Sequence, residues 1–263
     1  MTLTENIVDR IVASTRKSLA ERTHQVPHSV IKDLARKAGL PRDFAGALKG
    51  PGINVIAEIK RASPSKGWIN ETLDPAKQAL SYEAGGAAAI SVLTEPVFFH
   101  GSFADLEQAR DAVDLPALCK DFILSPYQIY EARFHRADAI LLIASILDGA
   151  GLRELSEVAR SLGMATLVET HNREEVEKAI AAGVRLFGIN NRNLTDFSID
   201  LETTVTLRRL IPSWARVVSE SGIKSRVDVQ KLEAAGANGI LVGESLVTSA
   251  DPAAQIRLLR GLP

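Results

Sequence analysis

Residues 54–60 read Asn-Val-Ile-Ala-Glu-Ile-Lys, an almost uninterrupted apolar run that ends on charged side chains. A short run of this kind is typical of a strand in a parallel sheet whose two faces are both covered. Side chains alternate between the faces of a strand, so Glu58 and Lys60 point to one side and Ile59 to the other. The stretch therefore predicts a buried strand with a charged group at its carboxyl end.

Seven similar runs follow along the chain, and stretches of helical character separate them. The predicted strands are 54–60, 88–94, 117–122, 137–143, 165–169, 186–190, 216–219 and 239–242. The predicted helices are 75–84, 102–111, 152–162, 173–182, 225–235 and 252–259. Strands that alternate with helices indicate a parallel sheet. Eight such units within about two hundred residues favour an α/β fold that closes into a (β/α)8 TIM barrel.

Glycines mark where several of these helices are expected to end in a left-handed residue. They are Gly85, Gly86, Gly163, Gly183 and Gly236. The helix before the fourth strand has no such glycine and runs into Phe134-His135-Arg136.

The chain is expected to be one domain over residues 1–263, with an N-terminal helical extension over 1–50 and the barrel over 51–263. Thr4 is expected to cap a first helix that carries Ile7 on its apolar face. Further helices are predicted over 30–38 and around Phe44. The extension either packs on the barrel as structural support or acts as a lid or an oligomer contact.

Charge and composition exclude several classes of protein. The chain has 31 Lys and Arg against 32 Asp and Glu, without the basic excess of nucleic-acid-binding proteins. Its apolar runs are too short to span a membrane, and its first residues do not resemble a signal peptide. Cys119 is the only cysteine and the histidines show no metal-ligand spacing, so neither a disulfide nor a metal site is expected. We expect a cytoplasmic protein, monomeric or weakly homo-oligomeric, with no nucleic-acid or membrane partner.

Charged residues recur where the predicted strands end. They are Glu58, Lys60, Lys120, Glu169, Glu220 and Glu244. Active sites of these barrels lie at the carboxyl ends of the strands. One charged strand end is explained by contact with water, but a whole set is costly unless the charges are paired or used. The set predicts an active site.

The last two strand ends suggest a phosphate site. Ser221-Gly222 and Gly243-Glu244 place glycines where a backbone can approach a ligand closely, and a short helix is expected to begin at Glu244. The basic loop 60–67 is either a further anion-binding loop or an exposed turn. His171 follows the fifth predicted strand and is given no role.

Residues 55–67, Val-Ile-Ala-Glu-Ile-Lys-Arg-Ala-Ser-Pro-Ser-Lys-Gly, closely resemble the first-strand signature of indole-3-glycerol-phosphate synthases. Similar matches continue at 91–95, 99–102, 120–122, 167–169, 190–194, 219–222 and 241–243. The chain departs from the family at Cys119, where arginine is frequent, and at His100, where glutamine is common. Cys119 neighbours Lys120 and is expected to face away from the barrel interior.

The resemblance implies a carboxy-lyase of tryptophan biosynthesis that needs no cofactor. Its substrate would be the small phosphorylated molecule 1-(2-carboxyphenylamino)-1-deoxyribulose 5-phosphate, and its product indole-3-glycerol phosphate. In the family Lys120 is the usual acid for ring closure, and nearby cations or burial are expected to lower its pKa. Lys60 contacts the carboxylate or phosphate, or is the acid for dehydration. Glu169 is the main candidate for the base and Glu58 its competitor, and the roles within each pair are interchangeable.

The resemblance also implies the groups that bind the substrate. Asn190, Arg192 and Glu220 orient the sugar hydroxyls or the catalytic side chains, and Ser63 helps to hold the carboxylate. The phosphate is bound by Ser221, Gly222, Gly243 and the backbone N–H of Glu244. The anilino ring requires an apolar slot, for which the candidates, equally well explained as core, are Phe122, Leu141, Ile143, Phe99, Pro64 and Phe197. Two rival interpretations are an aldolase-like Schiff base on Lys60 or Lys120 and a barrel that only binds its ligand.

Overall fold

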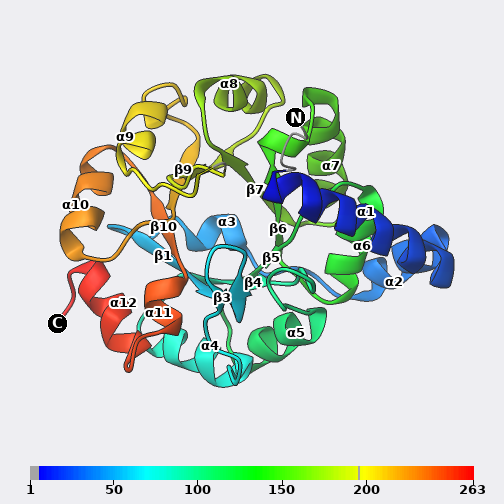
Figure 1. Cartoon of the computed structure of the whole chain (residues 1–263), viewed down its shortest axis with the longest axis horizontal. Helices are drawn as coiled ribbons and strands as arrows, with labels where there is room; N and C mark the ends of the chain where they lie inside the picture. The colour runs from blue at the N-terminus through cyan, green and yellow to red at the C-terminus, as the bar shows by residue number, and fades with distance from the viewer. Residues whose placement is uncertain (1–5, 195) are drawn as a thin grey trace, which may run out of the picture.

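The computed structural model describes residues 6–194 and 196–263. A closed barrel of parallel strands forms its centre, with neighbours in the order β1-β10-β9-β8-β7-β6-β5-β4 (Figure 1). The strands are β1 (Asn54–Ile59), β4 (Ala89–Leu93), β5 (Ala117–Lys120), β6 (Ala139–Ile143), β7 (Ala165–Thr170), β8 (Leu186–Asn190), β9 (Arg216–Glu220) and β10 (Gly239–Val242). The predicted barrel is confirmed, and each predicted strand ends within about two residues of the observed one.

Helices form a ring around the barrel (Figure 1). They are α4 (Pro75–Ala84), α5 (Phe103–Ala112), α6 (Pro126–Phe134), α7 (Gly149–Ser161), α8 (Arg173–Ala181), α9 (Glu202–Arg208), α10 (Arg226–Ala234) and α12 (Pro252–Arg260). Most begin at a side chain that accepts a hydrogen bond from the first turn, which satisfies one of the free N–H groups there. These caps are Asp74, Ser102, Ser125, Asp148, Asn172, Ser225 and Asp251.

Short elements fill the loops at the carboxyl ends of the strands. The expected helix at Glu244 is α11 (Glu244–Val247), and the 3-10 turn η1 (Ala144–Ile146) follows β6. The sequence did not predict α9 or the small antiparallel hairpin of β2 (Ala62–Ser63) and β3 (Gly67–Trp68). Strands of two residues are too short to show an alternating pattern.

The helix ends follow the expected glycines with two differences. Gly86, Gly163, Gly183 and Gly236 have φ between 75° and 90°, whereas Gly85 has φ −76° and the left-handed expectation for it is wrong. Arg136 takes the left-handed position after α6 with φ 67°. This arginine explains how α6 ends without a glycine.

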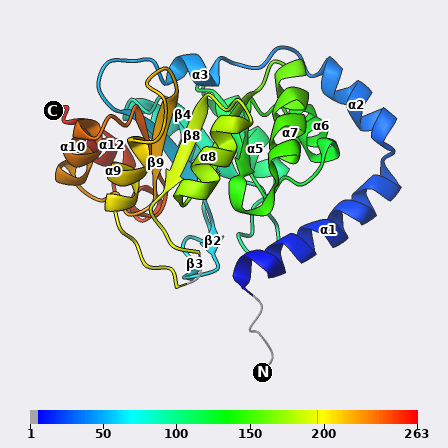
Figure 2. The same ribbon diagram turned by 90° about the horizontal axis from the view of Figure 1, so that it is seen from above.

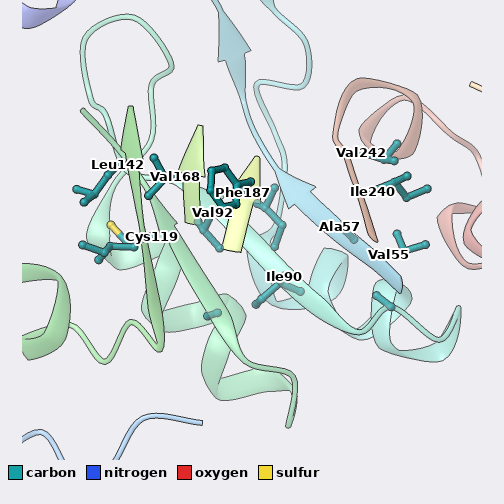
Figure 3. Close-up of a cluster of buried hydrophobic side chains, with 14 of the residues drawn as sticks. Val55, Ala57, Ile90, Val92, Cys119, Leu142, Val168, Phe187, Ile240 and Val242 are labelled. Carbon is teal, nitrogen blue, oxygen red and sulfur yellow. The ribbon is translucent and has the colours of Figure 1, made fainter. Parts of the chain in front are cut away.

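The barrel has two apolar layers. Residues such as Val92, Cys119 and Leu142 point outward and pack beneath the helices (Figure 3). Cys119 therefore faces away from the interior, as expected. A second layer fills the barrel itself, where Leu118 packs with Phe44 of α3 (Phe44–Ala47).

A buried acid ties the extension to the strands. Asp138 is 0% exposed and accepts hydrogen bonds from Arg110 Nη2 (2.9 Å), from the Ala117 backbone N–H (2.9 Å) and from the Arg42 backbone N–H (2.9 Å). A second arginine, Arg133, places Nη1 3.8 Å from the same carboxylate. This network lies at the start of β5 and β6, where it serves stability.

The N-terminal helices have different partners. Helix α1 (Ile7–Gln25) begins at Asn6, whose side chain accepts from the Val8 N–H at 3.1 Å. Thr4, the expected cap, lies outside the described residues. Helix α2 (His28–Lys37) packs on α6. Helix α1, which precedes it, lies along the outside of the barrel, and its N-terminal end is on the side that carries β2 and β3 (Figure 2).

Within the part of the chain that the structure describes, the helices are all too short or too polar to cross a membrane.

Candidate active site

A cavity of about 450 Å³ opens at the carboxyl ends of the strands, and residues from all eight strands line it. The structure brings every predicted site residue to this cavity. They are Glu58, Lys60, Ser63, Lys120, Phe122, Leu141, Glu169, Asn190, Arg192, Glu220, Ser221, Gly222, Gly243 and Glu244. The period-two alternation that placed Glu58 and Lys60 on one face is thus reproduced.

Glu58 lies between the two lysines. Lys60 Nζ donates a very short hydrogen bond to Glu58 Oε1, and Lys120 Nζ lies 3.2 Å from Oε2. Burial alone would raise the pKa of Glu58, but the ammonium groups of Lys120 and Lys60 lower it to about 2. A Cβ at Gly243 would lie 2.3 Å from Glu58 Oε1, so glycine makes room for this carboxylate. Glu58 is therefore an ionised anchor for both cations.

Lys120 faces carboxylates on several sides. Its Nζ lies 3.2 Å from Glu58 Oε2 and 3.7 Å from Glu220 Oε2. Burial favours the neutral amine, but the charges of Glu58, Glu220 and Glu169 raise the pKa of Lys120 above its usual value. The expectation of a lowered pKa is wrong, because the groups that surround the ammonium are acids rather than cations.

Glu220 is also a buried acid, but its pKa is raised, whereas that of Glu58 is lowered. Burial and the nearby Glu169 carboxylate raise its pKa to about 8, while Lys120 opposes the shift. Both of its carboxyl oxygens lack a hydrogen-bond partner among the described residues. A Cβ at Gly188 would lie 2.1 Å from Glu220 Oε1. A buried carboxyl that lines a cavity without a hydrogen-bond partner calls for an explanation, and a bound ligand would supply one.

Glu169 forms an ion pair with His171, which lies outside the cavity lining. Its Oε1 lies 3.2 Å from Nε2 of His171, whose Nδ1 lies 3.1 Å from Glu175 Oε2. Burial would raise the pKa of Glu169, but His171 and then Lys120 lower it to about 2. Burial likewise opposes the charge on His171, yet the two glutamates raise its pKa to about 10.

The turn at Ser221 and Gly222 forms part of the cavity lining. Ser221 and Gly222 are consecutive left-handed residues with φ 68° and 84°. Asn191 fixes this turn, since its side-chain amide donates to the carbonyls of Glu220 (2.9 Å) and Ser221 (3.1 Å). Such a turn can direct backbone N–H groups at an anion.

Apolar side chains form a second part of the cavity lining. Ile7, Val8 and Ile11 of α1 contribute to its wall, so this helix forms part of the site rather than only a support. The rings of Phe99 and Phe122 lie 6.3 Å apart, with Leu141, Ile143, Pro64 and Phe197 also in the lining. All six candidates for an apolar slot therefore reach the cavity.

Two cations of the basic loop 60–67, Arg61 and Lys66, have different partners. Arg61 turns away and binds Asp105 with two hydrogen bonds of 2.9 and 3.1 Å. Lys66 lines the cavity and donates to Glu244 Oε1 at 2.8 Å. This hydrogen bond lowers the pKa of Glu244, and the Lys66 ammonium offsets the charge of the carboxylate. The loop is therefore not entirely an anion-binding loop, since Arg61 pairs elsewhere, and not simply an exposed turn, since Lys66 lines the cavity.

A family model described as indole-3-glycerol phosphate synthase matches residues 8–259. The chain belongs to this family. It is 46% identical over 246 residues to the indole-3-glycerol phosphate synthase of Mycolicibacterium gilvum, covering 94% of this chain and 90% of the relative. It is 41% identical over 269 residues to that of Lachnoclostridium phytofermentans, covering 97% and 99%. As a member, the chain is an enzyme of the lyase class.

Solved structures with low sequence identity share the fold of this indole-3-glycerol phosphate synthase family member. A thiamine phosphate pyrophosphorylase from Pyrococcus furiosus has a TM-score of 0.60 at 17% identity, covering 80% of this chain and 94% of that one. A 3-hexulose-6-phosphate synthase has a TM-score of 0.60 at 14% identity, covering 80% and 99%. These likenesses show the barrel and nothing about the reaction.

The residues that sequence reasoning missed lie behind the cavity wall. His171 shares the face of Glu169 by the period of two and lies four residues before Glu175, so both spacings were visible. Asn191 was part of a matched motif but received no role. Among the described residues, no group of three or more His, Cys, Asp or Glu side chains is placed to hold a metal ion.

Proposed function

We propose that the chain converts 1-(2-carboxyphenylamino)-1-deoxyribulose 5-phosphate to indole-3-glycerol phosphate with loss of carbon dioxide and water. The observation that carries the proposal is the pairing of Lys60 and Lys120 on Glu58 inside a cavity that both apolar and polar residues line. The apolar and the polar lining residues suit the anilino ring and the phosphate of this substrate. Membership of the family supports the same assignment.

The substrate is proposed to lie across the cavity with its ring against Phe122, Leu141 and helix α1. Its phosphate then reaches the turn at Ser221-Gly222 and the backbone N–H groups at Gly243-Glu244. Arg192 and Ser63 line the same cavity. Arg192 is proposed to supply a cation for the phosphate, and Ser63 to hold the ring carboxylate.

Ring closure needs an acid. The ring carbon that bears the carboxylate attacks the ketone carbon, and the ketone oxygen takes a proton from Lys120 as the new bond forms. The bond to the carboxylate then breaks, carbon dioxide leaves and the ring regains its aromatic electrons. Because nearby carboxylates raise the pKa of Lys120, its side chain already carries the proton when each turnover begins. Developing charge on the ketone oxygen makes it a stronger proton acceptor than those carboxylates.

Dehydration needs an acid and a base together. The base removes a proton from the methylene next to the nitrogen, and an acid protonates the departing hydroxyl, which leaves as water. Glu58 is held by two ammonium groups, which favours Glu169 as the base and Lys60 as the acid. Asn190 and Glu220 border Glu169 in the cavity and orient the substrate beside it.

The test is a continuous fluorescence assay for indole-3-glycerol phosphate, run on the parent and on Lys120→Ala. We expect activity in the parent and a fall of roughly 100-fold or more in the variant, the usual contribution of a general acid. Lys77→Ala is a matched control, because the Lys77 side chain is 84% exposed and pairs only at the surface.

Other outcomes would change the assignment. An active Lys120→Ala variant would move the acid role to Lys60. A folded parent that binds the substrate without forming product would overturn the proposed reaction. A borohydride-trapped adduct on either lysine would favour a Schiff-base enzyme, although a protonated Lys120 is poorly suited to that chemistry.

A further inference from the structure

His171 is clamped between two carboxylates. Its Nε2 lies 3.2 Å from Glu169 Oε1 in the cavity wall, and its Nδ1 lies 3.1 Å from Glu175 Oε2. The imidazole side chain is only 12% exposed, and it does not line the cavity. A neutral imidazole can donate from one nitrogen only, so two carboxylate neighbours suit the doubly protonated ring.

Glu175, the carboxylate on the far side of the ring from Glu169, is held in place at the start of helix α8. Glu175 Oε2 also accepts from the His171 backbone N–H at 2.8 Å, and Glu175 Oε1 accepts from the Asn172 side-chain amide at 2.9 Å. Asn172 in turn caps α8 by accepting from the Glu175 N–H at 2.9 Å. The position of the ring is therefore set by the backbone of the loop between β7 and α8.

We propose that His171 is a positioning residue for Glu169, holding one carboxylate oxygen at the wall and supplying the positive charge that keeps this base ionised. The inference rests on the proposed function, because it takes Glu169 as the base for dehydration. His171 touches no substrate in this role and acts only through Glu169.

The charges around the pair explain why a cation is needed there. Glu169 is buried, and burial by itself raises the pKa of this carboxyl and opposes its charge. Lys120 offsets part of this cost, but Glu58 and Glu220 already share that ammonium. Without the imidazolium, the pKa of Glu169 rises and the base is protonated at a higher pH.

The contact with Glu169 also leaves the base usable. His171 Nε2 lies within ion-pair distance of the carboxylate but makes no hydrogen bond of good geometry among the described residues. The imidazolium therefore stabilises the charge without a well-aligned bond to the oxygen. Glu169 itself lines the cavity, where it can meet the substrate.

The charge on His171 is tested directly by nitrogen-15 NMR of the imidazole rings, with the His171→Gln variant identifying its signals among five histidines. We expect His171 to stay doubly protonated at pH 8, where ordinary histidines are neutral. Glu169→Gln should lower the pKa of His171. A neutral His171 ring at pH 7 would overturn the inference, whether or not the enzyme makes indole-3-glycerol phosphate.

The effect on the base is tested by pH profiles of kcat/KM. For His171→Gln we expect the acidic limb to move up by at least about one pH unit, with activity recovering towards pH 8. His171→Lys keeps a cation and should leave the limb closer to that of the parent. Glu175→Gln removes one of the two negative charges that keep the His171 ring protonated. It should therefore move the acidic limb upward, as His171→Gln does.

A matched control separates this role from a structural one. His135→Gln removes another histidine–glutamate pair, with Nδ1 3.0 Å from Glu107 Oε1, away from the cavity lining. It should leave the profile unchanged. If folded His171→Gln lost activity equally at every pH with an unmoved limb, His171 would be structural only and the proposal would fail.

Discussion

Replacing Gly188 with alanine tests whether the position of the Glu220 carboxyl controls turnover. A Cβ at residue 188 would lie 2.1 Å from Glu220 Oε1 and 3.2 Å from its Cδ. The next neighbour, Glu169 Cα, lies at an ordinary 3.5 Å, so the clash falls on the mobile end of one side chain. The backbone can stay in place while the carboxyl moves.

The expected magnitude follows from the size of that movement. Restoring an ordinary contact requires the carboxyl to shift by about 1 Å, a misplacement that typically costs on the order of 100-fold in rate. Because overpacking of a core costs about 1–3 kcal/mol and this clash involves a side-chain end, we expect a stability loss near the lower limit. Gly188→Ala should therefore lose far more activity than stability.

The assay measures kcat and KM by product fluorescence and the free energy of unfolding in urea. Gly149→Ala is the control, since a Cβ there meets nothing closer than 3.9 Å at the start of α7, and it should retain full activity. Glu220→Ser shortens the obstructing side chain. In that background Gly188→Ala should add little further loss, because the two changes act through one contact. Full activity of Gly188→Ala, or independent losses in the double variant, would refute the reasoning.

Three further predictions address the charges. Glu58→Gln removes the leading cause of the raised Lys120 pKa, so the basic limb of the kcat profile should move to lower pH and kcat should fall about 10- to 100-fold. Glu220 has a folded pKa of about 8, above its unfolded value of roughly 4.3, so its stabilisation is complete below pH ~4.3 and is lost as the pH rises to about 8. Glu220→Gln should accordingly flatten the fall of urea stability between pH 5 and 8, and an unchanged slope would contradict the raised pKa. Asp138→Asn breaks the buried pair with Arg110 and should cost about 3–5 kcal/mol in urea unfolding, with kcat of the folded enzyme unchanged.

Most of the barrel could be predicted from local sequence. Apolar strands of four to six residues and capped helices repeat along the chain, and each carries its own signal. The site followed from the same signal, because the period of two fixes which strand-end residues point inward. Glu58 and Lys60 were placed together in this way, and the parallel strands brought Lys120 to them.

The environment of each charge could not be predicted. The pKa of Lys120 depends on carboxylates from β1, β7 and β9, whose distances exist only after the barrel closes. Sequence reasoning counted burial and missed that acids, not cations, surround this lysine. The spacings of His171 to Glu169 and Glu175 were visible, but the sequence does not show that both carboxylates contact one imidazole ring. Arg136 shows a further limit, as nothing local marks it for a left-handed conformation.

The proton on Glu220 links the geometry of the site to the charge of its ligand. Glu58 and Glu169 are ionised, and Lys60, Lys120 and His171 oppose them with positive charge. A third ionised carboxylate among them would repel a substrate that carries both a phosphate and a carboxylate. Burial and the Glu169 charge instead keep the Glu220 carboxyl protonated near neutral pH. Gly188 thus does more than relieve a clash: by admitting Glu220 beside Glu169, it lets one carboxylate hold the other neutral while the anion binds.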